Sequence, residues 1–151
     1  MQILGTHHVG LSTSDLPRLR AFYIEMLGLP VVGAFLGHDI VFVQAGGTVI
    51  ELIGETDPAD TAPASASGFD RRGWQHLAWE VDDIDAAYAE LTARGIVFTL
   101  PPEEFPPAAP VLRIAFFADP DGNLIELVQP LGRRYPPLPD AASEPTWTEW
   151  T

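Results

Sequence analysis

The sequence predicts an α+β protein built from two tandem βαβββ modules, and an internal repeat is the main observation behind this prediction. His8 to Leu16 lines up with His76 to Ile84, and Gly47 to Ile53 lines up with Gly122 to Val128. The first pair of segments begins with a histidine and the second with a glycine, and each is followed by an apolar run. The two kinds of segment occur in the same order in both halves of the chain. Each half of the chain also contains one helical pattern and four short apolar runs. Each half therefore reads as strand, helix, strand, strand, strand.

Two segments have the apolar spacing of a helix that packs one face against a sheet. The first helix is expected after Asp15 and the second after Asp83, because an aspartate at the N-cap accepts hydrogen bonds from free backbone N–H groups. Gly28 and Gly95 are the expected ends. The apolar positions are Leu16, Leu19, Phe22, Tyr23, Met26 and Leu27 in the first helix and Ile84, Ala87, Tyr88 and Leu91 in the second.

Eight strands are predicted from apolar runs bounded by turn residues. They are expected near 3–13, 31–36, 39–45, 48–54, 74–81, 96–100, 111–118 and 123–129. Asp121-Gly122 lies between the last two strands and is typical of a hairpin turn.

The modules are expected at 1–54 and 74–130. Between them, 55–73 is polar and rich in Ala, Ser, Pro and Asp, which is typical of a linker or lid loop. The Pro-rich stretch 101–110 is expected to be a loop. The segment 131–151 reads as a Pro-containing tail whose tryptophans, Trp147 and Trp150, dock on the body or on a second subunit.

Composition excludes several classes of function. The 151 residues contain 8 basic and 21 acidic side chains, and the formal net charge of −13 disfavours nucleic acid or an anionic membrane surface as a partner. Every basic residue is arginine, so a Schiff-base lysine and a Walker-type phosphate loop are excluded. The lack of cysteine excludes disulfides, thiolate nucleophiles and iron–sulfur clusters. Neither a secretory signal nor a membrane span is recognisable, so a cytoplasmic protein is expected.

Two histidines and two glutamates occupy equivalent places in the repeat: His8, Glu51, His76 and Glu126. Each histidine begins the first strand of a module and each glutamate lies in the last strand, between apolar neighbours. A strand with apolar residues at all other positions is expected to be buried on both faces, where an unpaired carboxylate is strongly unfavourable. A divalent ion of the Zn, Ni, Co, Mn or Fe(II) group is the simplest compensating charge.

The chain resembles the vicinal oxygen chelate superfamily, also called the glyoxalase/bleomycin resistance protein/dioxygenase superfamily, from about residue 4 to 130. The resemblance is carried by HHVGLSTSDLPRLRAFYIEMLGLPVVG, GGTVIELIG, QHLAWEVDDIDAAYAELTARGI and AFFADPDGNLIELVQP. It implies paired modules forming a curled mixed sheet around a metal cleft. It also implies a small-molecule substrate that is chelated through adjacent oxygens.

The resemblance favours one branch of this superfamily through Glu51. Dioxygenases and fosfomycin-resistance proteins use two histidines and one glutamate, and bleomycin-binding members lack the metal ligands. Glyoxalase I and the epimerases fill all four positions, as this chain does. The prediction is therefore a metal-dependent lyase/isomerase of the glyoxalase I type. A methylmalonyl-CoA epimerase-like enzyme, an Fe(II) extradiol-type dioxygenase and a non-enzymatic drug- or metabolite-binding resistance protein are the alternatives.

The expected mechanism is proton transfer through an enediolate that the metal stabilises as a Lewis acid. Glu126, or Glu51 by the pseudo-twofold symmetry, is the expected general base. Arg113 and His38 are candidates for substrate binding, as are Arg18 and Arg20 for an anionic substrate.

Other residues are given structural roles. His7 is expected to point to the face of the strand opposite His8. Phe42, Phe116, Phe117, Trp74 and Trp79 are expected first of all in the core. By analogy with the superfamily, the chain is expected to form a homodimer. Whether the cleft forms within one chain or across the dimer stays open.

Overall fold

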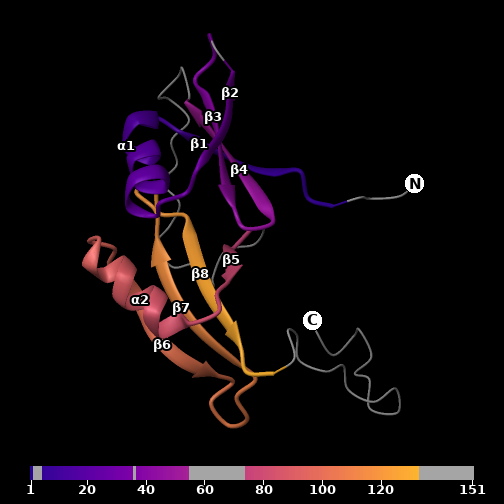
Figure 1. Cartoon of the computed structure of the whole chain (residues 1–151), viewed down its shortest axis with the longest axis vertical. Helices are drawn as coiled ribbons and strands as arrows, with labels where there is room; N and C mark the ends of the chain where they lie inside the picture. The colour runs from indigo at the N-terminus through magenta and orange to yellow at the C-terminus, as the bar shows by residue number, and fades with distance from the viewer. Residues whose placement is uncertain (2–4, 36, 55–73, 133–151) are drawn as a thin grey trace.

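The computed structural model describes residues 1, 5–35, 37–54 and 74–132. These residues form two four-stranded mixed sheets with the same strand order, β1-β4-β3-β2 and β5-β8-β7-β6 (Figure 1). In each sheet the first and last strands of the module pair in parallel and the remaining pairs are antiparallel. The predicted α+β class and the two βαβββ modules are confirmed.

All eight predicted strands are present. The first module contains β1 (His8–Thr13), β2 (Val31–Phe35), β3 (Ile40–Ala45) and β4 (Thr48–Gly54). The second contains β5 (His76–Glu80), β6 (Phe98–Phe105), β7 (Leu112–Ala118) and β8 (Leu124–Pro130).

Both helices begin at the predicted aspartates. Helix α1 (Leu16–Arg20) continues as a π-helical segment, η1 (Ala21–Met26), and α2 spans Ile84–Ala93. The Asp15 carboxylate accepts a hydrogen bond from the Arg18 amide at 3.1 Å, and Asp83 accepts one from Ala86 at 3.0 Å. Gly28 and Gly95 follow the helices with φ of +73° and +92°, a conformation that glycine adopts without steric cost.

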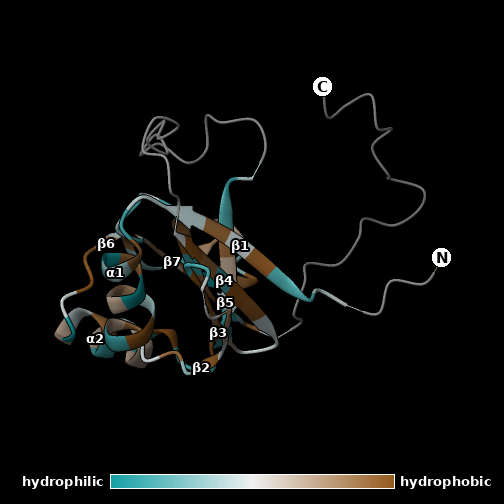
Figure 2. Ribbon diagram, turned by 90° about the horizontal axis from the view of Figure 1, so that it is seen from above, coloured by the Kyte–Doolittle hydropathy of each residue, from teal (hydrophilic) through white to brown (hydrophobic). Residues whose placement is uncertain are grey.

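Both helices lie on the same side of the two sheets (Figures 1 and 2), and the core is built there. Tyr23 of the first module and Phe117 of the second are both fully buried in one shared cluster. The Tyr23 hydroxyl donates a hydrogen bond to Asp119 Oδ2 at 3.0 Å, and Arg94 Nη1 donates to the Met26 carbonyl at 3.1 Å. The modules are therefore joined through their helical sides, which leaves the opposite sheet faces less covered.

Three expectations differ from the structure. Strand β6 runs through Pro101 and Pro102 to Phe105, where a loop over 101–110 was predicted. It is an edge strand, and an edge strand tolerates proline because its outward N–H groups need no partner. Strand β1 begins at His8 and not near residue 3. The two sheets remain separate, so the described residues of one chain do not form a single curled sheet around a cleft.

Some expectations lie outside the described residues. These are the linker 55–73 and the docking of Trp147 and Trp150 from the tail. Within the described part of the chain, no helix is long and apolar enough to cross a membrane.

Candidate metal centre

The first pair of predicted ligands meets on one face of the first sheet. We call His8 and Glu51 the first half-site. Parallel pairing of β1 with β4 places Gly10 opposite Glu51, so the His8 and Glu51 side chains project from the same face. His8 Nε2 lies 3.3 Å from Glu51 Oε2. The glutamate side chain is only 15% exposed, whereas the imidazole is more open to solvent.

The second pair repeats this geometry in the second sheet. We call His76 and Glu126 the second half-site. Pairing of β5 with β8 places Ala78 opposite Glu126, and His76 Nε2 lies 3.0 Å from Glu126 Oε2. The Glu126 side chain is 12% exposed. Register, face and donor atoms are thus the same in both modules, as the repeat predicts.

Burial changes the acidity of Glu126. Loss of water around the carboxyl raises its pKa above the ordinary value, although the charge and the hydrogen bond of His76 act in the opposite direction. A carboxylate with a raised pKa binds a proton more readily than an exposed one. Glu126 is therefore suited to receive a proton from a bound molecule.

The four predicted ligands form two pairs and not one cluster. Among the described residues, no group of three or more His, Cys, Asp or Glu side chains is arranged to hold a metal ion. Each pair nevertheless supplies an imidazole nitrogen and a carboxylate oxygen side by side on a rigid sheet, and this donor set suits a divalent transition metal. Either half-site fits part of the coordination sphere of such an ion, and both together fit four positions.

The sheet face around the half-sites is only partly covered. Along β4, Ile50 and Leu52 are buried while Val49, Glu51 and Ile53 are partly exposed. The expectation that this strand is buried on both faces is therefore wrong for the single chain. The half-site face is apolar enough in sequence to be buried, and a single chain does not cover it fully.

One aromatic residue accompanies each half-site, Phe42 in the first and Phe116 in the second; both were expected first of all in the core. Phe42 pairs across strands with Glu51, and its ring centroid lies 6.2 Å from that of His8. Phe116 pairs with Glu126, and its ring lies 5.6 Å from that of His76. Both phenylalanines lie in the third strand of a module and could have been found by extending the repeat. Phe116 is also in the buried core, as predicted, whereas Phe42 is only half-buried.

His7 also differs from its expected position. It precedes β1, so strand alternation does not apply to it, and its Nδ1 lies 2.8 Å from His8 Nδ1. The two rings pack edge to face with centroids 5.1 Å apart. His7 therefore contacts a predicted ligand directly and does not point to the opposite face.

The substrate-binding candidates lie elsewhere. His38 is exposed in the turn between β2 and β3, where its backbone bonds to Phe35 and Ile40. Arg113 donates two hydrogen bonds to Asp85 of α2, at 2.6 and 2.8 Å, on the helical side of β7. Arg18 and Arg20 are exposed on α1.

Other proteins are similar to this chain in sequence and fold. A family model described as the Glyoxalase/Bleomycin resistance protein/Dioxygenase superfamily matches residues 5–127. A probable lactoylglutathione lyase of Vibrio cholerae is 32% identical over 133 residues, covering 81% of this chain and 88% of the relative. Human mitochondrial methylmalonyl-CoA epimerase is 34% identical over 98 residues, covering 60% and 53%. The crystal structure of TnmS3, an antibiotic binding protein from Streptomyces sp. CB03234, is 30% identical with a TM-score of 0.66, covering 86% and 98%.

Proposed function

Since the chain belongs to the Glyoxalase/Bleomycin resistance protein/Dioxygenase superfamily, we propose that it is a divalent-metal-dependent lyase/isomerase of the glyoxalase I type. The observation that carries this proposal is the pair of matching half-sites, in which all four donor positions are filled by histidine or glutamate. Similarity to a probable lactoylglutathione lyase supports the same reaction class.

The complete centre is proposed to form between two chains. The half-sites do not meet within the described part of one chain, and their apolar sheet faces are incompletely covered. Packing the first half-site of one chain against the second half-site of its partner would bury these faces and bring four ligands together. A twofold homodimer of this kind contains two equivalent centres.

Each residue has a role in this proposal. His8, Glu51, His76 and Glu126 would hold one divalent ion, which supplies Lewis-acid stabilisation of negative charge on two adjacent substrate oxygens. Glu126 would loosen from the ion, remove a proton from the neighbouring carbon and return it to the adjacent one, and the burial that raises the pKa of its carboxyl above the ordinary value supports this role. The half-buried sheet face limits access of water to the carboxylate.

An acyl-CoA epimerase is the second candidate, supported by similarity to the human methylmalonyl-CoA epimerase. It uses the same proton abstraction, but a proton is then added to the opposite face of the same carbon by a donor on that side. Screening thiol hemiacetals and acyl-CoA epimers in parallel separates the two reactions, since only the first changes the oxidation level at two neighbouring carbons.

Metal content and subunit complementation test the proposal. Purified protein is expected to hold about one divalent ion per chain, and His8→Ala and His76→Ala are each expected to lose it. When the two variants are co-expressed, a heterodimer with shared centres regains one intact centre, because one chain keeps its first half-site and the other keeps its second. Metal in the mixture but in neither variant alone supports the shared centre. Metal loss in all three samples indicates centres within one chain, and a metal-free wild type contradicts the enzyme proposal.

A further inference from the structure

The sheet face beside the first half-site is open over Phe42. The residue across from Phe42 on the edge strand β2 is Gly33, which has no side chain to cover the ring. In the second module the residue across from Phe116 is Leu100, and Phe116 is only 5% exposed. An aromatic ring therefore lies beside each glutamate, and the ring of the first module is left half-buried.

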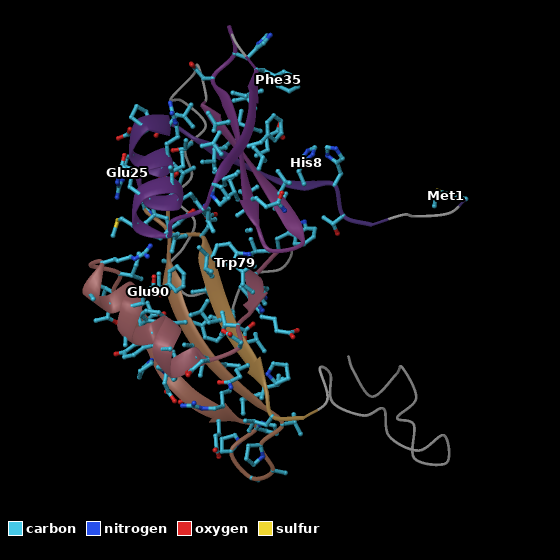
Figure 3. The ribbon with its side chains drawn as sticks, in the orientation of Figure 1. Met1, His8, Glu25, Phe35, Trp79 and Glu90 are labelled. Atoms are coloured by element: carbon cyan, nitrogen blue, oxygen red, sulfur yellow. The ribbon has the colours of Figure 1, made fainter. Side chains whose placement is uncertain are left out.

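A row of rings leads from this edge to the half-site. Phe35 is 56% exposed, and its ring centroid lies 5.5 Å from that of Phe42 at an interplanar angle of 80°. Phe42 in turn contacts His8 edge to face at 70°. Figure 3 shows Phe35 and His8 on the same module, with Phe35 at the outer end of the sheet. Aromatic rings attract one another in edge-to-face and offset-stacked geometry, so an additional ring placed against these side chains gains favourable contacts.

In the described part of the chain, the arginines do not supply this face with a cationic group for an anionic substrate. Of the described arginines, Arg18 and Arg20 lie on α1. Arg94 bonds to Glu90 and to the Met26 carbonyl, and Arg113 bonds to Asp85. All four belong to the helical side of the sheets, away from the face that carries Phe42. With a formal net charge of −13 on the whole chain, an anionic thiol adduct gains little from this surface.

We propose that Phe35, Phe42 and the space over Gly33 form a subsite for an uncharged aromatic group of the substrate, next to the first half-site. The inference rests on the proposed function and deepens it, because the adjacent oxygens of the same substrate would bind the ion that the two half-sites hold. It identifies the substrate as an uncharged molecule with an aromatic ring close to its two neighbouring oxygens.

Hydroxamates test the subsite because they chelate divalent metals through adjacent oxygens. Calorimetry with Ni²⁺- and Zn²⁺-supplied protein compares benzohydroxamate, acetohydroxamate and the carboxylate-bearing succinic monohydroxamate. Benzohydroxamate is expected to bind about tenfold more tightly than the other two, the effect of one additional aromatic contact. Phe35→Ala and Gly33→Leu are expected to remove this preference and to leave acetohydroxamate binding unchanged. A Cβ at Gly33 makes only ordinary van der Waals contact with Phe42, at 3.5 Å, so a side chain can begin at this position without a clash at its Cβ.

Phe105→Ala is the matched control. Phe105 is a phenylalanine of similar exposure, 48%, on the edge strand of the second module, and its loss is expected to leave the preference intact. Equal affinity for benzohydroxamate and acetohydroxamate, or equal losses in Phe35→Ala and Phe105→Ala, overturns the subsite while leaving metal chelation intact.

A second probe separates failure of the subsite from failure of the proposed function. If no hydroxamate binds, the metal proposal fails, and 2-naphthol is titrated into metal-free protein with amide chemical shifts as the readout. Shifts at Phe35 and Phe42 that disappear in Gly33→Leu support the subsite. Shifts that spare these residues overturn it.

Discussion

The two half-sites have the same backbone register but different surroundings. Around Glu126, Phe116 is buried behind Leu100 and loss of water raises the carboxyl pKa. Around His8, the imidazole contacts His7 and the neighbouring Phe42 is left open by Gly33. The repeat has thus kept the four donor side chains and changed what lies beside them. This difference fits different roles for the two half-sites in the proposed function, with proton transfer at the second and binding of the substrate's aromatic group beside the first.

The turns that precede the two glutamate-bearing strands, β4 and β8, also differ in their hydrogen bonds. Before β4, the Gln44 side chain donates hydrogen bonds to two backbone carbonyls of its own hairpin, at Gly46 and Thr48, and to no other described residue. Before β8, Asp119 accepts hydrogen bonds from Asp121 and Asn123 and also from Tyr23 of the other module. The second turn is therefore tied to the core that joins the modules, and the first is an independent hairpin.

The largest predicted effect breaks the equivalence of the two glutamates. Glu126→Gln is expected to lower turnover by about 10³-fold, the range for loss of a general base, while the protein keeps part of its metal. Glu51→Gln is expected to lower metal content more than it lowers turnover per bound ion. The measurement is proton exchange with D₂O by NMR on the hemithioacetal of phenylglyoxal and 2-mercaptoethanol, with metal content determined on the same samples. Equal turnover losses per metal in both variants would contradict the assignment of Glu126 as the base.

The second prediction compares the two turns by their effect on stability. Asp119→Ala is expected to lower the free energy of unfolding by about 3 kcal/mol, because the buried Tyr23 hydroxyl and several partly buried donors of the turn lose their acceptor. Gln44→Ala is expected to cost about 1 kcal/mol, because its hydrogen bonds are local and more exposed. Urea unfolding of both variants measures the difference. Equal losses of unfolding free energy in the two variants would show that the hydrogen bond between Tyr23 and Asp119 does not add to the stability of the second turn.

Much of this organisation could be predicted from the sequence. Apolar runs located the eight strands and the N-cap aspartates located both helix starts, because apolar period and N-cap chemistry are local properties. The repeat identified the four residues that form the two His–Glu pairs. The separation of the pairs could not be predicted, because it depends on how two modules pack through Tyr23 and Phe117, a contact between distant segments. The position of His7 was predicted wrongly because β1 begins at His8, so the alternation of side chains along a strand does not apply to His7. The continuation of β6 through two prolines was missed because only the topology shows that it is an edge strand.

The third prediction concerns pH and the contact between the modules. Burial, and then the neighbouring charge of Asp119, raise the pKa of Tyr23 well above its ordinary value of about 10. The folded state therefore holds this proton more tightly than the unfolded state, and the stabilisation present below pH 10 is lost as the pH rises further. Above pH 10, stability is expected to fall by up to about 1.4 kcal/mol per pH unit in the wild type, and less in Tyr23→Phe.

Tyr88→Phe is the control for that experiment, because Tyr88 contacts Phe98 and forms no hydrogen bond with another described residue through its hydroxyl. Urea midpoints between pH 9 and 11 give the comparison. A wild-type slope that Tyr23→Phe and Tyr88→Phe reduce equally would remove Tyr23 from the explanation.

The smallest predicted effect concerns Arg113, which the sequence offered as a substrate-binding residue. Its guanidinium bonds to Asp85 on the helical side of β7, whereas Phe116 and Glu126 face the other side. Hydrogen bonds from Arg113 lower the pKa of Asp85, so this pair stabilises the folded state at neutral pH and loses its effect as the solution is acidified through the folded-state pKa. The pair is exposed and screened by salt, so Arg113→Ala is expected to lower the melting temperature only slightly and to leave benzohydroxamate affinity unchanged. A several-fold loss of benzohydroxamate affinity in Arg113→Ala, together with unchanged affinity in Phe35→Ala, would contradict this prediction. It would place binding of the aromatic group in the second module and not in the first.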